Sequence, residues 1–162
     1  MKNAPGPQAV GRIMRAYFLD QRSVVMIIVS ACLAGFPCRY DGKATIHEKT
    51  RELVKAGKAI LVCPEQLGGL PTPRSPSEIK NGNVISKEGM DVTKEFERGA
   101  AIVLEIANAY GCKEAILKAR SPSCGKGKIY DGNFTGKTIA GNGKTAELLL
   151  KNGIEVKTEE EI

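Results

Sequence analysis

Short apolar runs recur along this chain, separated by longer stretches in which apolar and polar residues mix. The runs contain β-branched residues and are too short for an isolated helix. Runs of this length and composition predict buried β-strands. The expected strands are residues 26–31 (MIIVSA), 59–62 (AILV), 114–119 (EAILKA) and 154–158 (IEVKT).

The stretches between these strands include segments of helical character. Apolar residues repeat at helical spacing over 91–111, where Asp91 or Thr93 can cap the start of the helix. Shorter helices are predicted over 47–56 and 144–153, and a glycine stands at the end of each predicted helix. Strands that alternate with helices favour a three-layer α/β domain with a mainly parallel, Rossmann-like sheet.

Two connections stand out by their length. Residues 63–91 are rich in proline and glycine, and residues 120–143 are rich in glycine, so we expect both to be loops. Loops this long inside a compact domain usually have a function. The tail at 159–162 (EEEI) is expected to be solvated.

The first 25 residues differ from the rest of the chain. They lack clear periodicity and contain four basic residues against one acidic residue. We interpret 1–25 as an extension outside the fold, disordered or an artefact of an upstream start codon. The alternative is a basic arm that binds a partner. Residues 26–162 are long enough for a single α/β domain with a proper core.

Composition and charge narrow the range of functions. Hydrophobic residues make up 42% and charged residues 26% of the 162 residues, as in an ordinary globular protein. About half of the net charge of +6 falls within 1–25, and there is no Trp to stack on a base, which argues against nucleic acid as a partner. No apolar stretch is long enough to span a membrane. With five cysteines and no secretory signal, the natural setting is the cytoplasm; the oligomeric state stays open.

Three cysteines each follow a predicted strand. Cys32 and Cys63 stand at strand ends, and Cys124 comes a few residues after the third strand. Because the carboxyl ends of parallel strands gather at one edge of a sheet, these thiols are expected to meet. Cys112 precedes a strand, at the opposite edge, and is excluded. Such a meeting of thiols predicts a bound metal or iron–sulfur cluster.

Polar residues of catalytic or binding type accompany these cysteines. Cys38 and Arg39 lie shortly after Cys32, and small residues around them leave room for a bulky ligand. Glu65 follows Cys63 and can serve as a general base or acid, or be an ordinary solvated carboxylate. Ser121 and Ser123 precede Cys124 among basic residues that favour a thiolate.

Other motifs carry competing hypotheses. His47 is the only histidine, and a cysteine hydrolase would need it as a base. The segments GKGK (125–128) and GNGKT (141–145) suggest a small-anion or nucleotide-binding module, although the spacing of a phosphate-binding loop is missing. Four thiols, those of residues 32, 38, 63 and 124, could instead close a structural or regulatory zinc site, although no CxxC is present.

Three long blocks of the sequence resemble one family. SACLAGFPCRYDG, VCPEQLGGLPTPRSPSEI and LKARSPSCG are similar to the signature blocks of a bacterial and archaeal domain-of-unknown-function family that includes the iron–sulfur thiouracil desulfidases. The resemblance covers residues 26–156. It implies an oxygen-sensitive [4Fe–4S] cluster held by Cys32, Cys63 and Cys124, with one iron open for the sulfur of the substrate. Cys38 would lie beside the cluster or exchange with one of the three.

The resemblance also implies an activity, the non-redox removal of sulfur from a small thiolated heterocycle such as thiouracil. By the same resemblance Glu65 is the catalytic carboxylate and Ser121 the catalytic serine. Glu65 would activate water, and Ser121 would donate a proton or hold developing charge. The expected contacts with this small-molecule substrate are Arg39, Arg74 and Ser123.

Overall fold

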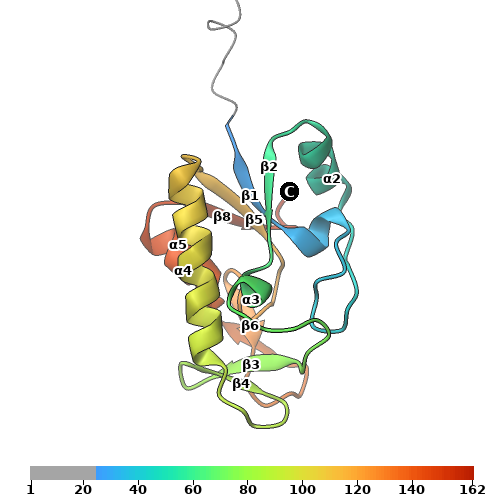
Figure 1. The fold of residues 1–162 in the computed structure, drawn as a ribbon. Helices are drawn as coiled ribbons and strands as arrows, with labels where there is room; N and C mark the ends of the chain where they lie inside the picture. The colour runs from blue at the N-terminus through green and yellow to red at the C-terminus, as the bar shows by residue number, and fades with distance from the viewer. Residues whose placement is uncertain (1–24) are drawn as a thin grey trace, which may run out of the picture.

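The computed structural model describes residues 25–162, so the expected extension at 1–25 lies outside the described residues except for Val25. The four predicted strands form one parallel sheet in the order β2-β1-β5-β8 (Figure 1). Their bounds are β1 Ile27–Ser30, β2 Ala59–Val62, β5 Glu114–Leu117 and β8 Glu155–Thr158. The predicted fold class, α/β with a parallel sheet, is confirmed.

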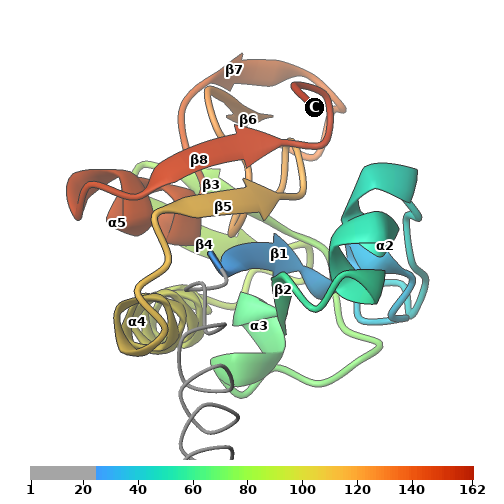
Figure 2. The same ribbon diagram turned by 90° about the horizontal axis from the view of Figure 1, so that it is seen from above.

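Helices cover both faces of this sheet (Figure 2). Helices α4 (Thr93–Ala109) and α5 (Lys144–Lys151) pack on one face, and α2 (Glu48–Lys55) with the short 3₁₀ helix η1 (Ala31–Ala34) on the other. Successive residues of β1 point to opposite faces of the sheet. Ile28 packs against α4 and α5, whereas Val29 packs against Leu33 of η1. No helix within residues 25–162 has the length and apolar character to cross a bilayer.

The strand order determines where a ligand can bind. The chain leaves β1, crosses one face through α2 to β2, and then returns past β1 across the other face through α4 to β5. The connections that leave β1 and β5 therefore diverge, and a crevice opens at the carboxyl ends of these strands. This is the edge where the sequence places the cysteines.

The two expected loops contain structure that we did not predict. The first holds the short helix α3 (Pro64–Leu67) and the hairpin β3 (Ser77–Lys80) to β4 (Asn83–Ser86). Its turn is Asn81-Gly82, with φ of 51° and 83°, and an Asn-Gly pair between strands is a strong hairpin signal that we overlooked. The second holds the hairpin β6 (Lys128–Tyr130) to β7 (Thr138–Ala140).

Helix α3 lies against α4 at two glycines. A Cβ on Gly99 of α4 would lie 1.9 Å from the carbonyl oxygen of Pro64, and one on Gly68 would lie 1.9 Å from that of Glu95. Neither glycine has a left-handed φ, so the requirement is for space rather than for conformational freedom. This contact holds α3, and Glu65 within it, at the cavity described below.

Gly99→Ala is therefore expected to push α3 away and to destabilise the protein by about 3 kcal/mol, at the upper end of the cost of overpacking. Urea unfolding of the purified variant measures this change. Ala101→Ser, at an exposed position of the same helix, is the matched control and is expected to stay within about 0.5 kcal/mol of wild type. An unchanged midpoint in Gly99→Ala would contradict the close contact.

Candidate active site

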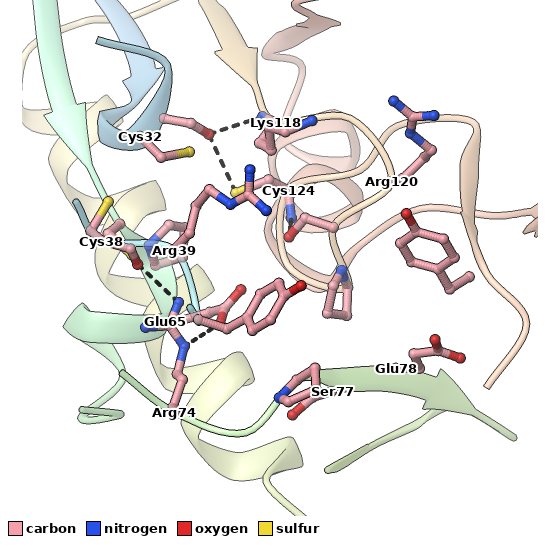
Figure 3. A pocket seen from close by; sticks show the side chains of 18 of the residues that line it. Cys32, Cys38, Arg39, Glu65, Arg74, Ser77, Glu78, Lys118, Arg120 and Cys124 are labelled. Carbon is pink, nitrogen blue, oxygen red and sulfur yellow. Dashed lines mark hydrogen bonds and ion pairs between the residues drawn. The ribbon is translucent and has the colours of Figure 1, made fainter. Parts of the chain in front are cut away.

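A cavity of about 540 Å³ opens at the carboxyl ends of β1, β2 and β5 (Figure 3). Four cysteines from three separate segments of the chain line it. All five cysteines of the chain are free, and the fifth, Cys112, is buried in the core at the start of β5, away from the cavity. The lining thiols are those of Cys32, Cys38, Cys63 and Cys124.

These thiols interact with one another. A hydrogen bond with Cys32 raises the pKa of Cys38 to about 11. A hydrogen bond with Cys38, together with burial, also raises the pKa of Cys63, whose Sγ donates to the carbonyl oxygen of Cys38 at 3.6 Å. Burial raises the pKa of Cys124 to about 12. In the metal-free protein the raised pKa values of Cys38, Cys63 and Cys124 therefore keep these three thiols protonated at neutral pH.

The raised thiol pKa values predict that the metal-free, reduced protein loses stability in alkali. Below the ordinary pKa of 9.0 the folded and unfolded chains both keep these protons. Between pH 9 and about 12 the unfolded chain releases protons that the folded protein retains, so the free energy of unfolding falls. Thermal unfolding between pH 8 and pH 11 measures this. Cys38→Ala, which removes one shifted thiol, should show a shallower fall; a flat profile in wild type would contradict the prediction.

Glu65 lies in the first turn of α3 and is held by Arg74. Nε of Arg74 donates to Oε2 of Glu65 at 2.6 Å, and Nη2 donates to the carbonyl oxygen of Cys38 at 3.1 Å (Figure 3). Nη1 of Arg74 donates to the carbonyl oxygen of Pro71 and to Oγ1 of Thr72, and the Arg74 side chain is only 6% exposed. Arg74 lines the cavity and orients Glu65 and the segment around Cys38; its contact with the substrate stays a prediction.

The two serines before Cys124 are placed differently. Oγ of Ser121 lines the cavity and accepts the backbone N–H groups of Ser123 and Cys124, both at 3.1 Å. With its acceptor sites used, its own proton is available to a substrate. Ser123 is fully buried, bonds Oγ1 of Thr145 at 2.9 Å and does not line the cavity. The structure therefore encloses Ser123 behind the cavity wall, a position that does not favour the predicted contact with the substrate.

Arg39 also lines the cavity, and it remains partly open to solvent. Its guanidinium donates to Oγ1 of Thr45 at 2.6 Å, pairs with Asp41 at 3.4 Å and lies 5.8 Å from the centre of the Tyr40 ring. The side chain is 31% exposed. Of the three predicted substrate contacts, Arg39 is thus the most exposed to solvent, whereas the side chains of Arg74 and Ser123 are buried.

One cavity residue was not predicted. Glu78, on β3, is 8% exposed and accepts the backbone N–H of Phe134 through Oε2 at 3.0 Å. Within residues 25–162 its Oε1 accepts no hydrogen bond, yet this atom is not sealed from solvent, so it faces the cavity. Figure 3 shows Glu78 on the far side of the cavity from Cys32 and Cys38. The Asn-Gly turn signal, which places Glu78 on a strand, could have identified it.

The C-terminal tail is partly solvated, as predicted for Glu160 and Glu161, but it also makes ion pairs that the sequence did not predict. Three consecutive glutamates pair with basic residues of the segment that follows β5, and Oε2 of Glu159 also accepts the backbone N–H of Ala119 at 2.7 Å. This segment includes Ser121 and Cys124, so the tail fixes one wall of the cavity. The pairs are Glu159 with Lys118, Glu160 with Arg120, and Glu161 with Lys126.

Residues that two competing hypotheses would need are either outside the cavity or already bonded within the protein. His47 precedes α2, its Nδ1 has no hydrogen-bond partner among residues 25–162, and it does not line the cavity, so it cannot act as the base of a cysteine hydrolase there. Gly143 is the N-cap of α5. Lys144 beside it donates to the carbonyl oxygen of Gly82 at 2.7 Å and pairs with Glu97 at 3.5 Å. Its charge is thus used within the protein rather than offered to a phosphate.

Fold and cavity together define a class: a small parallel α/β protein whose thiols and anchored carboxylate share one site, as in enzymes that use a thiolate-bound metal or cluster. Comparison with known proteins identifies the family. The profile of the 2-thiouracil desulfurase family matches residues 27–161, and the chain belongs to that family.

Two relatives illustrate the similarity. The uncharacterized protein YbbK of Bacillus subtilis (strain 168) is 45% identical over 147 residues, which is 85% of this chain and 97% of that protein. A solved structure of the [4Fe-4S]-dependent thiouracil desulfidase TudS is 47% identical, with a TM-score of 0.82 over 85% of this chain and 92% of that chain. The family resemblance expected from the sequence is confirmed, as is its link to iron–sulfur desulfidases.

Proposed function

We propose that this protein hydrolyses the carbon–sulfur double bond of a small thiolated heterocycle of the thiouracil type, using a [4Fe–4S] cluster. The observation that supports this most directly is the gathering of four free thiols and Glu65 around one cavity, in a member of the 2-thiouracil desulfurase family. Free thiols suit a reducing compartment, so we place the reaction in the cytoplasm.

The donor set fits a cluster better than a single ion. Within the described residues 25–162, no three Cys, His, Asp or Glu side chains are arranged to hold one metal ion. A tetrahedral zinc site would draw its sulfurs to about 2.3 Å from a common centre. Thiols spread around a cavity match a bulkier group, for which Cys32, Cys63 and Cys124 are the proposed ligands. When bound, a cluster with one iron free of protein ligands supplies a soft Lewis acid for a thiocarbonyl sulfur.

Glu65 has the position of a general base. Its carboxylate lines the cavity two residues after Cys63, and the bond from Arg74 fixes one oxygen and leaves the other toward the cavity. It can take a proton from a water that attacks the carbon bearing the sulfur. The net reaction is C=S plus water giving C=O plus hydrogen sulfide, in which no electrons are gained or lost.

Ser121 has the position of a proton donor. Its oxygen is held by two backbone N–H groups, so its hydroxyl hydrogen can bond the ring nitrogen or the oxygen on which negative charge develops. Arg39 and Glu78 face the cavity from the β1 loop and from β3, and they offer one cation and one carboxylate to the polar edge of the heterocycle.

Glu78→Ala tests the binding role of that carboxylate. We expect KM for 2-thiouracil to rise about tenfold with kcat nearly unchanged, because a hydrogen bond to a charged group is lost while the reacting atoms keep their partners. Glu88→Ala, which removes an exposed carboxylate of the following turn, is the control. A fall confined to kcat would instead assign Glu78 to the chemical step.

Anaerobic reconstitution tests the function as a whole. The protein is purified without oxygen, supplied with iron and sulfide, analysed for bound metal, and assayed for sulfide release from 2-thiouracil. Bound iron and sulfide, absorbance near 400 nm and release of sulfide are the expected results. Zinc at one ion per chain without iron, or a cluster-loaded protein that releases no sulfide from any thiopyrimidine tested, would contradict the proposal.

A further inference from the structure

Ser30 is the last residue of β1, and its hydroxyl lies between two neighbouring strands at the cavity. Its Oγ accepts the backbone N–H of Lys118 at 3.0 Å and donates to Sγ of Cys124 at 3.4 Å. In Figure 3 these two bonds are the dashed lines that leave one oxygen near Cys32, one toward Lys118 and the other toward Cys124. Ser30 is 2% exposed, so solvent has little access to compete for its hydroxyl.

The hydroxyl of Ser30 does not cap the helix that it precedes. Ser30 is the N-cap residue of η1, where a serine usually accepts an N–H from the first helical turn, but it makes no such bond. Its oxygen is occupied by the amide of Lys118, beyond the last β1–β5 pair at Val29 and Ile116. An oxygen that accepts an N–H becomes a stronger donor through its own hydrogen, which points at the sulfur of Cys124.

We infer that Ser30 is a positioning residue for Cys124, which it orients as a cluster ligand and from which it withdraws electron density. This inference rests on the proposed function. Hydrogen bonds to ligand sulfurs help to determine the reduction potential of iron–sulfur clusters, and groups that orient ligands contribute to metal affinity. In a reaction that transfers no electrons, weaker donation from Cys124 would make a bound cluster a stronger Lewis acid toward a thiocarbonyl sulfur.

The test compares Ser30→Ala and Ser30→Thr with wild type after anaerobic reconstitution. Ser30→Ala is expected to lose iron to a chelator about two- to tenfold faster, the range that one net hydrogen bond provides, and to show a more negative reduction potential. Ser30→Thr keeps a hydroxyl and should stay near wild type in both measurements. Thr50→Val is the matched control, because fully buried Thr50 bonds the carbonyl oxygens of Leu33 and His47 and, within residues 25–162, makes no hydrogen bond to a cysteine sulfur.

The outcomes separate this inference from the proposed function. A wild type that takes up no cluster overturns both. A loaded wild type with the same potential and rate of iron loss in Ser30→Ala overturns only the role of Ser30. The role is also overturned if Thr50→Val changes both values as much as Ser30→Ala does, or if Ser30→Thr behaves like Ser30→Ala, because the hydroxyl at Cys124 would then not be the cause.

Discussion

Cys63→Ala is expected to abolish cluster binding and sulfide release together. Cys63 is the N-cap of α3, lines the cavity, and interacts through its thiol with Cys38. Groups that orient a ligand contribute up to about 100-fold to metal affinity or activity, so losing the ligand itself should cost more than about 100-fold. Iron and sulfide content after anaerobic reconstitution, followed by the sulfide-release assay, measures both effects. Cys32→Ala and Cys124→Ala are expected to behave in the same way.

Cys112→Ala is the matched control for these variants. This cysteine is 3% exposed and packs in the core on the α4 and α5 side, away from the cavity. Its loss should cost about 1 kcal/mol of stability, as an ordinary small truncation does, and leave iron content unchanged. A Cys63→Ala protein that holds as much iron as Cys112→Ala would remove Cys63 from the ligand set.

Cys38→Ala decides the question that the sequence left open about the fourth thiol. Cys38 bonds both Cys32 and Cys63, so its position alone does not distinguish a ligand from a neighbour. With Cys32, Cys63 and Cys124 as ligands, the variant should retain its cluster. Loss of iron equal to that of Cys63→Ala would place Cys38 among the ligands in exchange for one of them.

The meeting of the thiols could be predicted because it depends on the strands alone. Cys32 and Cys63 follow short apolar runs, and a parallel sheet brings the ends of such runs to one edge whatever the loops do. Cys112 could be set aside by the same argument, since it precedes its strand. The arrangement of layers was predictable too, because glycines stand at the helix ends and the apolar spacing changes from strand to helix.

The partners of individual side chains could not be predicted, because they depend on how loops pack against each other. Arg74 and Ser123 both belong to blocks that line the site, yet the carbonyl of Cys38 engages the first and the hydroxyl of Thr145 the second. Their polar groups are satisfied within the protein, as buried polar groups usually are. The ion pairs of the tail were missed for a related reason: Glu160 and Glu161 are exposed, as predicted, but the basic partners of the tail belong to the segment after β5, which only the fold places beside it.

Glu65→Gln is expected to lower kcat for sulfide release by about 10²- to 10⁴-fold, the usual contribution of a general base. The amide keeps the size of the side chain and an oxygen that can accept from Arg74, but it cannot take a proton from water. Since Glu65 lines the cavity without being one of the proposed ligands, iron content and KM should change little. Single-turnover assays of the reconstituted variant separate the chemical step from product release.

Glu97→Gln provides the comparison, because this carboxylate of α4 lies outside the cavity lining and is mostly exposed. It should retain wild-type kcat and iron content. If Glu65→Gln kept its iron and still turned over within about threefold of wild type, Glu65 would not be the base. If Glu65→Gln lost its iron, Glu65 would have a structural role instead. Its carboxylate would then serve mainly to hold the ends of β2 and α3 together around the thiols.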